Sequence, residues 1–167
     1  MEVLFNAGKA RSIGVSNWTI PRLQMLLQYA TIKPAINQIE IHPFLPNTEL
    51  IAFCTSHSIV PVAYSPLGSQ HQCPTTGEKL LENTELNRIA DQKGASLAQV
   101  LIAWGLQRGY AVLPKSSTRE RIRENFQVIG LTDGEFEAVN RVAKGRHTRF
   151  VNLKDVFGYD VWENEQK

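Results

Sequence analysis

A basic cluster near residue 118 is the clearest sign of chemistry in the sequence. It combines Lys115, Ser116, Thr118 and Arg121. A helix is predicted to begin at Thr118, and a helix N-terminus offers an anion free backbone N–H groups and a positive dipole end. Lysine and the forked arginine guanidinium add charge-assisted hydrogen bonds. A basic helical run is usually only solvated surface, but the preceding Lys-Ser-Ser sequence favours an anion site.

Three short apolar runs elsewhere also end in polar side chains. They are SIGV, which is followed by Ser16 and Asn17, AINQIEIH, which contains Gln38, and VPVA, which is followed by Tyr64 and Ser65. When strand, polar tip and helix recur in this order, the tips gather at one rim of a parallel sheet, where α/β folds place their sites. Taken alone, Ser16 and Asn17 could equally cap a helix, and Tyr64 could be ordinary packing. Their common place at strand ends favours a shared site.

The elements that must position these tips alternate along the chain. Strands are predicted at residues 12–16, 35–41, 60–65 and 110–114, where the runs are short and apolar. Apolar spacing, N-cap residues and glycine stops predict helices at residues 19–30, 47–58, 84–94, 96–109, 118–128 and 132–145, and residues 2–8 resemble the end of another helix. This alternation predicts an α/β fold of four parallel strands joined by right-handed crossovers.

Two segments fall outside this alternation. Residues 66–83 are rich in Gly, Pro, Ser and Thr and are too long for a routine connection, so a mobile or functional loop is expected there. Residues 146–167 are polar with scattered aromatics. We predict that residues 1–145 form the α/β body and that residues 146–167 are an irregular C-terminal tail.

Composition and charge narrow the classes of partner. The 167 residues are 43% hydrophobic and 20% charged, with a net charge of +2. So small a charge argues against nucleic acid or an anionic membrane as a partner, and no stretch is long and apolar enough to span a bilayer. The cysteines, Cys54 and Cys73, fit neither a disulfide framework nor a zinc spacing, and no histidine pattern indicates a metal. We therefore expect a cytoplasmic protein without a metal.

The polar tips and their flanking residues resemble the aldo-keto reductase family. The matching segments are residues 9–17 (KARSIGVSN), 36–45 (INQIEIHPFL), 63–69 (AYSPLGS) and 113–126 (LPKSSTRERIRENF). The resemblance implies the second half of a TIM-type (β/α)8 barrel, with NADPH-dependent reduction of small aldehydes or ketones to alcohols in the complete barrel. No GxGxxG motif occurs in the sequence, so a Rossmann fold is rejected.

The same resemblance implies which side chains would bind NADP. Ser16, Asn17 and Gln38 would hydrogen-bond the nicotinamide carboxamide, and Tyr64 would stack on its ring. The pyrophosphate would lie under the segment Ser65, Pro66, Leu67, Gly68 and Ser69. The adenosine 2′-phosphate and the adenine would be held by Lys115, Ser116, Ser117, Thr118, Arg121, Glu124 and Asn125. Basic residues here favour NADP, where an acidic residue would favour NAD.

The residues that move protons in the family are missing from the matching segments. The family uses an Asp, a Tyr, a Lys and a His from the first four barrel strands, which the resemblance places outside this sequence. Glu40 and His42 share one strand face, but the family uses neither as a proton donor, so structural roles are expected. The chain alone is then expected to be inactive, and an incomplete gene model would explain the start at Met1.

Two alternatives stay open at this point. The chain could be a non-catalytic regulatory or nucleotide-binding relative of the family, or, less well supported, an unrelated (β/α) phosphate-binding protein. A half barrel also leaves backbone edges exposed, so the chain could be an unstable fragment, could self-associate or could pair with a partner half.

Overall fold

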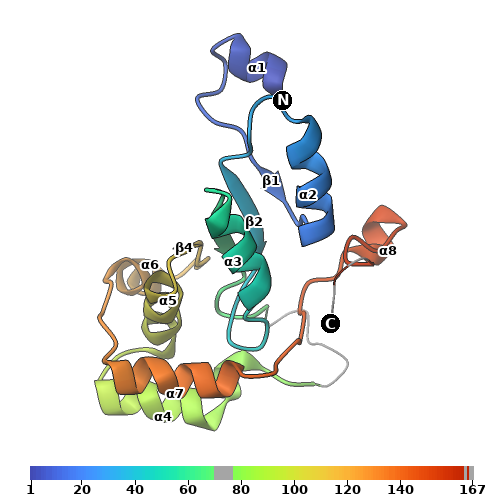
Figure 1. The fold of residues 1–167 in the computed structure, drawn as a ribbon. Helices are drawn as coiled ribbons and strands as arrows, with labels where there is room; N and C mark the ends of the chain where they lie inside the picture. The colour runs from blue at the N-terminus through green and yellow to red at the C-terminus, as the bar shows by residue number, and fades with distance from the viewer. Residues whose placement is uncertain (70–76, 164, 166–167) are drawn as a thin grey trace. The chain divides into compact units, whose positions relative to one another are not determined.

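The structure is a computed structural model that describes residues 1–69, 77–163 and 165 (Figure 1). It contains two compact units, each assembled from separate stretches of chain. Unit 1 consists of Met1–Ile39, Asn47–Val62 and Asn152–Lys167, and unit 2 of Glu40–Pro46 and Ala63–Val151. This division was not predictable from the sequence, because it follows contacts between distant segments and not a linker.

The predicted four strands are present, and they form one parallel sheet. They are β1 (Val15–Ser16), β2 (Ile36–Glu40), β3 (Val60–Tyr64) and β4 (Ala111–Val112), in the order β1-β2-β3-β4. In unit 1, Val15 pairs with Asn37 and Ser16 with Gln38. In unit 2, the Leu113 N–H donates to the Ala63 carbonyl over 3.0 Å. The chain thus has the expected α/β architecture with an open sheet, although β1 and β4 are two residues long where five were predicted.

The described part of unit 1 contains four helices: α1 (Glu2–Asn6), α2 (Ile20–Tyr29), α3 (Thr48–Ser56) and α8 (Lys154–Phe157). Thr19 and Asn47 precede α2 and α3 as predicted, but neither side chain makes a capping hydrogen bond. Gly14 lies against β2, where an added Cβ would be 3.0 Å from the Ile36 carbonyl and would collide with the Ile36 side chain. The close approach of these two segments therefore requires glycine before β1.

Unit 2 contains one short 3-10 helix and four α-helices: η1 (Leu80–Glu82), α4 (Thr84–Lys93), α5 (Leu97–Gln107), α6 (Arg119–Phe126) and α7 (Asp133–Ala143). Sequence reasoning placed η1 inside a loop. The N-termini of α5 and α7 carry capping boxes, in which Ser96 pairs with Gln99 and Thr132 with Glu135. Such reciprocal caps satisfy N–H groups that a helix cannot satisfy itself, which explains why both helices begin where they do.

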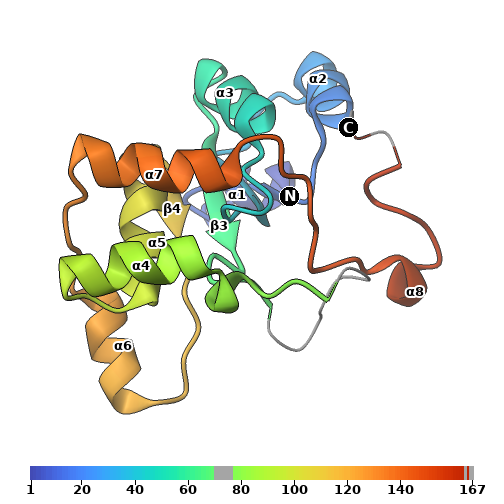
Figure 2. The same ribbon diagram turned by 90° about the horizontal axis from the view of Figure 1, so that it is seen from below.

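The core of unit 2 lies between α4, α5 and α7, which Figure 2 shows side by side. Trp104 is buried in α5, and its indole N–H donates to Asn140 Oδ1 of α7 over 2.8 Å. Lys93 Nζ at the end of α4 lies 2.8 Å from Glu135 Oε2 of α7. On α7, Val139 and Ala143 are buried. These contacts give the nearby loops a rigid base.

No helix in the described ranges is both long and apolar enough to cross a bilayer. Within the same ranges, no three His, Cys, Asp or Glu side chains are grouped as a metal centre requires.

Candidate functional site

Twelve of the sixteen predicted site residues line a single cavity of about 620 Å³ in unit 2. They are Ser65, Pro66, Leu67, Gly68, Ser69, Lys115, Ser116, Ser117, Thr118, Arg121, Glu124 and Asn125. This volume is within the range of small-molecule sites, about 300–1,000 Å³. The cavity therefore brings together two segments that are almost fifty positions apart in the sequence.

The N-terminus of α6 forms the basic wall of this cavity. The helix begins after Thr118, whose side chain makes no capping hydrogen bond, and the Thr118 N–H donates to Ser116 Oγ over 3.2 Å. Lys115 and Arg121 line the same wall, and neither makes an ion pair with another residue that the structure describes. Cations beside the positive end of a helix favour the binding of an anion.

The opposite part of the lining is a tight turn that follows β3. Ser65 has a φ of 47° and Gly68 a φ of 72°, both in the left-handed region, and the Gly68 N–H donates to the Ser65 carbonyl over 2.9 Å. A Cβ on Gly68 would lie 3.1 Å from Leu80 Cβ. The positive φ strains Ser65, which is not a glycine, and such strained residues are often found at functional sites. We call residues 65–69 the turn loop.

Tyr64 ends β3 and is half-buried, but it does not line this cavity. Its position directly before the turn loop is the one expected from the sequence. Its stacking role stays a prediction.

The other three predicted residues lie together in unit 1. Ser16 Oγ donates to the Gln38 carbonyl over 2.9 Å, and the Asn17 N–H donates to the same carbonyl, also over 2.9 Å. Asn17 has a φ of 59°, and its Oδ1 atom is buried without a hydrogen-bond partner among the described residues. A buried amide oxygen in this state can accept a hydrogen bond from a ligand N–H group. The β1–β2 register thus brings Ser16, Asn17 and Gln38 to one place.

Several lining residues of the large cavity were missed by sequence reasoning. They are Leu81, Asn87, Ser96, Leu97, Ala98 and Leu113. The Asn87 side chain is held by the carbonyls of Leu81 and Asn83, at 3.0 and 2.9 Å. The leucines and the alanine offer flat apolar surface of the kind that suits a planar base. In the sequence they resemble ordinary helix and core residues, so no signal could have identified them.

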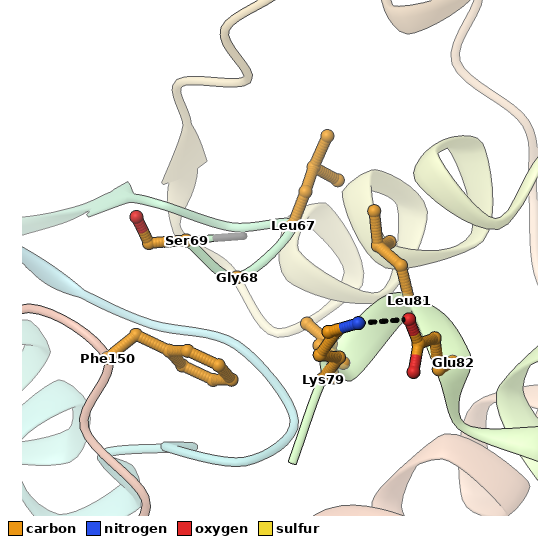
Figure 3. A pocket seen from close by; sticks show the side chains of 8 residues that line it. Leu67, Gly68, Ser69, Lys79, Leu81, Glu82 and Phe150 are labelled. Carbon is orange, nitrogen blue, oxygen red and sulfur yellow. Dashed lines mark hydrogen bonds and ion pairs between the residues drawn. The ribbon is translucent and has the colours of Figure 1, made fainter. Parts of the chain in front are cut away.

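A second cavity of about 260 Å³ adjoins the turn loop (Figure 3). It shares Leu67, Gly68, Ser69 and Leu81 with the larger cavity, and its other lining residues are Lys79, Leu80, Glu82 and Phe150. Lys79 Nζ lies 2.6 Å from Glu82 Oε1, the pair joined by the dashed line in Figure 3. The turn loop therefore contributes to the walls of both cavities.

Comparison with known proteins identifies related chains. A model described as "Aldo/keto reductase family" matches residues 1–144. The chain is 63% identical over 166 residues to "Glycerol 2-dehydrogenase (NADP(+))" of Hypocrea jecorina, covering 99% of this chain and 52% of that protein. It is 44% identical over 146 residues to a protein of the same name from Saccharomyces cerevisiae, covering 86% of this chain and 45% of that protein. The chain thus spans about half the length of the curated relatives it matches.

A solved structure described as an aldose reductase from Giardia lamblia matches with a TM-score of 0.87 and 38% identity, covering 98% of this chain and 54% of the other. The four parallel strands and their helices therefore correspond to half of a TIM-type (β/α)8 barrel, as predicted, with a sheet that does not close.

Proposed function

Because the chain belongs to the aldo/keto reductase family, we propose that it carries the NADP-binding part of an enzyme that reduces aldehydes or ketones to alcohols. The observation that carries this proposal is the convergence of twelve predicted cofactor residues on one cavity, in which Lys115 and Arg121 form no ion pair with any residue that the structure describes. Family membership also removes the unrelated phosphate-binding protein from the alternatives.

In this proposal the adenosine 2′-phosphate lies against Lys115, Thr118 and Arg121. The charged Lys115 and Arg121 side chains, the Thr118 hydroxyl and the N-terminal N–H groups of α6 supply hydrogen bonds that an NAD ribose hydroxyl could not use fully. The adenine lies toward Glu124 and Asn125, with Leu97 and Ala98 as apolar surface. The turn loop binds the pyrophosphate, where Gly68 permits close backbone approach.

In unit 1, the Gln38 amide and Asn17 Oδ1, which has no hydrogen-bond partner in the described part of the chain, are assigned to the nicotinamide carboxamide. This group has both a donor and an acceptor, which two amide side chains can satisfy together. When bound, the cofactor supplies the hydride for the reduction. The role of the unit 1 residues is to orient the ring, and Tyr64 is assigned to stacking on it.

We assign no proton donor to this chain. Glu40 and His42 are fully buried and bond to each other over 2.8 Å, which suits a structural pair and not a group that meets substrate. The chain on its own is therefore proposed to bind NADP without turnover. A non-catalytic nucleotide-binding relative is the second candidate, because it would need the same cavity and no proton donor.

Similarity to two proteins named glycerol 2-dehydrogenase extends the proposal to the substrate class. We propose that the complete enzyme acts on glycerol or a comparably small hydroxylated compound. The partner is then a small molecule, in keeping with the modest net charge of +2.

Self-association through the open half-barrel edges stays a prediction. We propose in addition that the apolar face of α6 contacts a second copy of the chain. Ile122 and Phe126 are 51% and 89% exposed one helical turn apart, and Val128 is 63% exposed. Exposed apolar clusters of this kind favour association. Light scattering on the purified chain tests this idea: a dimer that Phe126→Ser converts to monomer supports it, and a monomeric parent chain contradicts it.

A cytoplasmic location is proposed from the cysteine chemistry. Cys54 is a free thiol with no exposed surface, and burial raises its pKa despite a hydrogen bond from Asn37. A reducing compartment is where a free thiol persists. Cys73 lies outside the described residues.

Calorimetry on Lys115→Ala tests the proposed cofactor site. A charge-assisted bond is worth about 1.5–3 kcal/mol, so the dissociation constant for NADPH is expected to rise by about ten-fold or more, with little change for NADH. Arg123→Ala is the matched control, because Arg123 is an exposed cation on the same helix that does not line the cavity. If Lys115→Ala weakens the binding of NADPH and NADH equally, or if Arg123→Ala weakens NADPH binding as much, Lys115 does not bind the 2′-phosphate.

Turnover is tested separately. The 167-residue chain is expected not to oxidise NADPH with a reactive aldehyde above background, while it still binds the cofactor. Robust turnover would overturn the proposal that the chain alone has no proton donor.

A further inference from the structure

We propose that Glu40 is a positioning residue for the turn loop: its buried carboxylate fixes the backbone at Phe150, and the Phe150 ring supports the loop next to the bound pyrophosphate. This inference rests on the proposed NADP site, since the loop matters only if it holds the cofactor. All the groups involved belong to unit 2.

Glu40 has no exposed surface, and both of its carboxylate oxygens are used. Oε1 accepts from the Phe150 N–H over 2.7 Å and lies 2.8 Å from His42 Nε2. Oε2 accepts from the Val151 N–H over 3.0 Å and lies 3.9 Å from Arg149 Nη1. One side chain at the end of β2 therefore fixes two consecutive peptide groups that are 110 positions further along the chain.

A carboxylate is an expensive group to bury, and it is stable here only because donors surround it. An apolar side chain of similar size would avoid that cost but could not bind the N–H groups of residues 150 and 151. Glutamine has nearly the same shape, yet its amide has one acceptor oxygen, and its NH2 group would face a backbone donor. The arrangement thus depends on the charge as well as on the shape of Glu40.

The backbone bonds set the place of the Phe150 ring. The ring meets His42 edge-on, with centroids 4.9 Å apart at 73°, and it stacks near Phe44 at 6.4 Å and 14°. Thr148 also donates its N–H to the Phe44 carbonyl over 2.7 Å, so the approach to the ring is held on the same side. Phe150 is 6% exposed, which leaves the ring little freedom to move.

Phe150 meets the turn loop in the smaller cavity, where Figure 3 shows its ring across from Gly68 and Ser69. A Cβ added to Gly68 would lie 3.8 Å from Phe150 Cε2, an ordinary van der Waals distance, so the ring lies next to this position of the loop. The same loop residues line the large cavity. A displaced ring would therefore alter the loop on the side where the pyrophosphate is proposed to bind.

The proposed 2′-phosphate site does not depend on this support. Lys115, Thr118 and Arg121 do not line the smaller cavity, and none of them bonds to Glu40 or Phe150 in a contact the structure describes. Two ligands can therefore separate the effects. Adenosine 2′-monophosphate uses the basic wall only, whereas ADP-ribose 2′-phosphate also needs the turn loop.

The test is calorimetric titration of the full chain with both ligands. Glu40→Gln and Phe150→Leu are each expected to raise the dissociation constant for ADP-ribose 2′-phosphate by about five-fold. This is the effect expected when one hydrogen bond to the ligand is lost. Their dissociation constants for adenosine 2′-monophosphate are expected to change by less than about two-fold. Phe150→Leu leaves the carboxylate in place, so it keeps the test decisive even if Glu40→Gln does not fold.

Asn140→Ala is the matched control, since it removes another internal hydrogen bond of unit 2, from Trp104, far in sequence from the turn loop. It is expected to lower stability without changing the ratio of the two constants. Parallel losses for both ligands in the Glu40 and Phe150 variants, or no loss in either, overturn the inference while leaving the NADP site intact. A parent chain that binds neither ligand overturns both.

Discussion

Replacing Gly68 with alanine tests whether the turn loop is shaped by its neighbours or only by its own backbone. Gly68 has a φ of 72°, and an alanine Cβ there would lie 3.1 Å from Leu80 Cβ and 3.8 Å from Phe150 Cε2. The left-handed conformation costs an alanine about 1–2 kcal/mol, part of which is offset because alanine restricts the unfolded chain by about 0.4–1 kcal/mol. The crowding against Leu80 adds an overpacking cost of about 1–3 kcal/mol.

Gly109→Ala is the control that isolates this crowding. Gly109 has a similar φ of 85° in the same unit, but an added Cβ would meet nothing within 4 Å. Both variants carry the backbone cost, so the difference between them measures the contact alone. We expect urea unfolding to show Gly68→Ala less stable than Gly109→Ala by about 1–3 kcal/mol, with unchanged m-values.

The same substitution is expected to weaken binding of ADP-ribose 2′-phosphate, because the loop must shift to relieve the contact with Leu80. Gly109→Ala is expected to bind this ligand like the parent chain. If the two variants lose the same free energy of unfolding, the loop is not packed as the structure describes, and the role given to Phe150 in supporting it loses its basis.

Two further predictions concern the helices behind the site. Gly105→Ala in α5 is expected to destabilise the chain by about 1–3 kcal/mol in urea unfolding, because its Cβ would lie 2.7 Å from the Tyr110 ring, although the same change in an open helix stabilises. A stabilised variant would contradict the packing of α5. The pKa of Glu135 is lowered by its hydrogen bonds from Lys93 and from the backbone at residue 132. Its contribution to stability is therefore present above the unfolded pKa and lost as pH falls through the folded one. Chemical unfolding from pH 7 to pH 3 is expected to show a smaller loss for Glu135→Gln than for the parent chain, and identical profiles would contradict the pair.

The sequence was sufficient to predict four parallel strands with helices between them, because strand, polar tip and helix recur in the same order along the chain. It failed on strand length at β1 and β4. These strands are the first and last in the sheet order, so each pairs with one neighbour, and pairing on one side sustains fewer bridged residues than the apolar run would allow. An apolar run of residues predicts that a strand is buried, whereas the number of its residues that pair depends on the neighbouring strand.

The site was partly predictable for a similar reason. Lys115, Thr118 and Arg121 form a local pattern, so their chemistry could be inferred from adjacent residues. The partners of Glu40 could not, because Phe150 and Val151 lie more than a hundred positions away and contribute backbone groups that every residue has. Only a tertiary structure reveals that a buried glutamate is bound by peptide N–H groups and not by a catalytic partner.

The residues proposed to bind NADPH are divided between the two units, so the two groups of residues can be tested separately. The residues assigned to phosphate and adenine all belong to unit 2, and Ser16, Asn17 and Gln38 all belong to unit 1. A nucleotide fragment without nicotinamide therefore tests unit 2 by itself, whatever unit 1 contributes. Because charge-assisted bonds to phosphate are stronger than neutral amide bonds, most of the affinity for NADPH is expected to persist in such a fragment. A fragment that binds far more weakly than NADPH would place the main binding energy at Asn17 and Gln38 and would reverse this division.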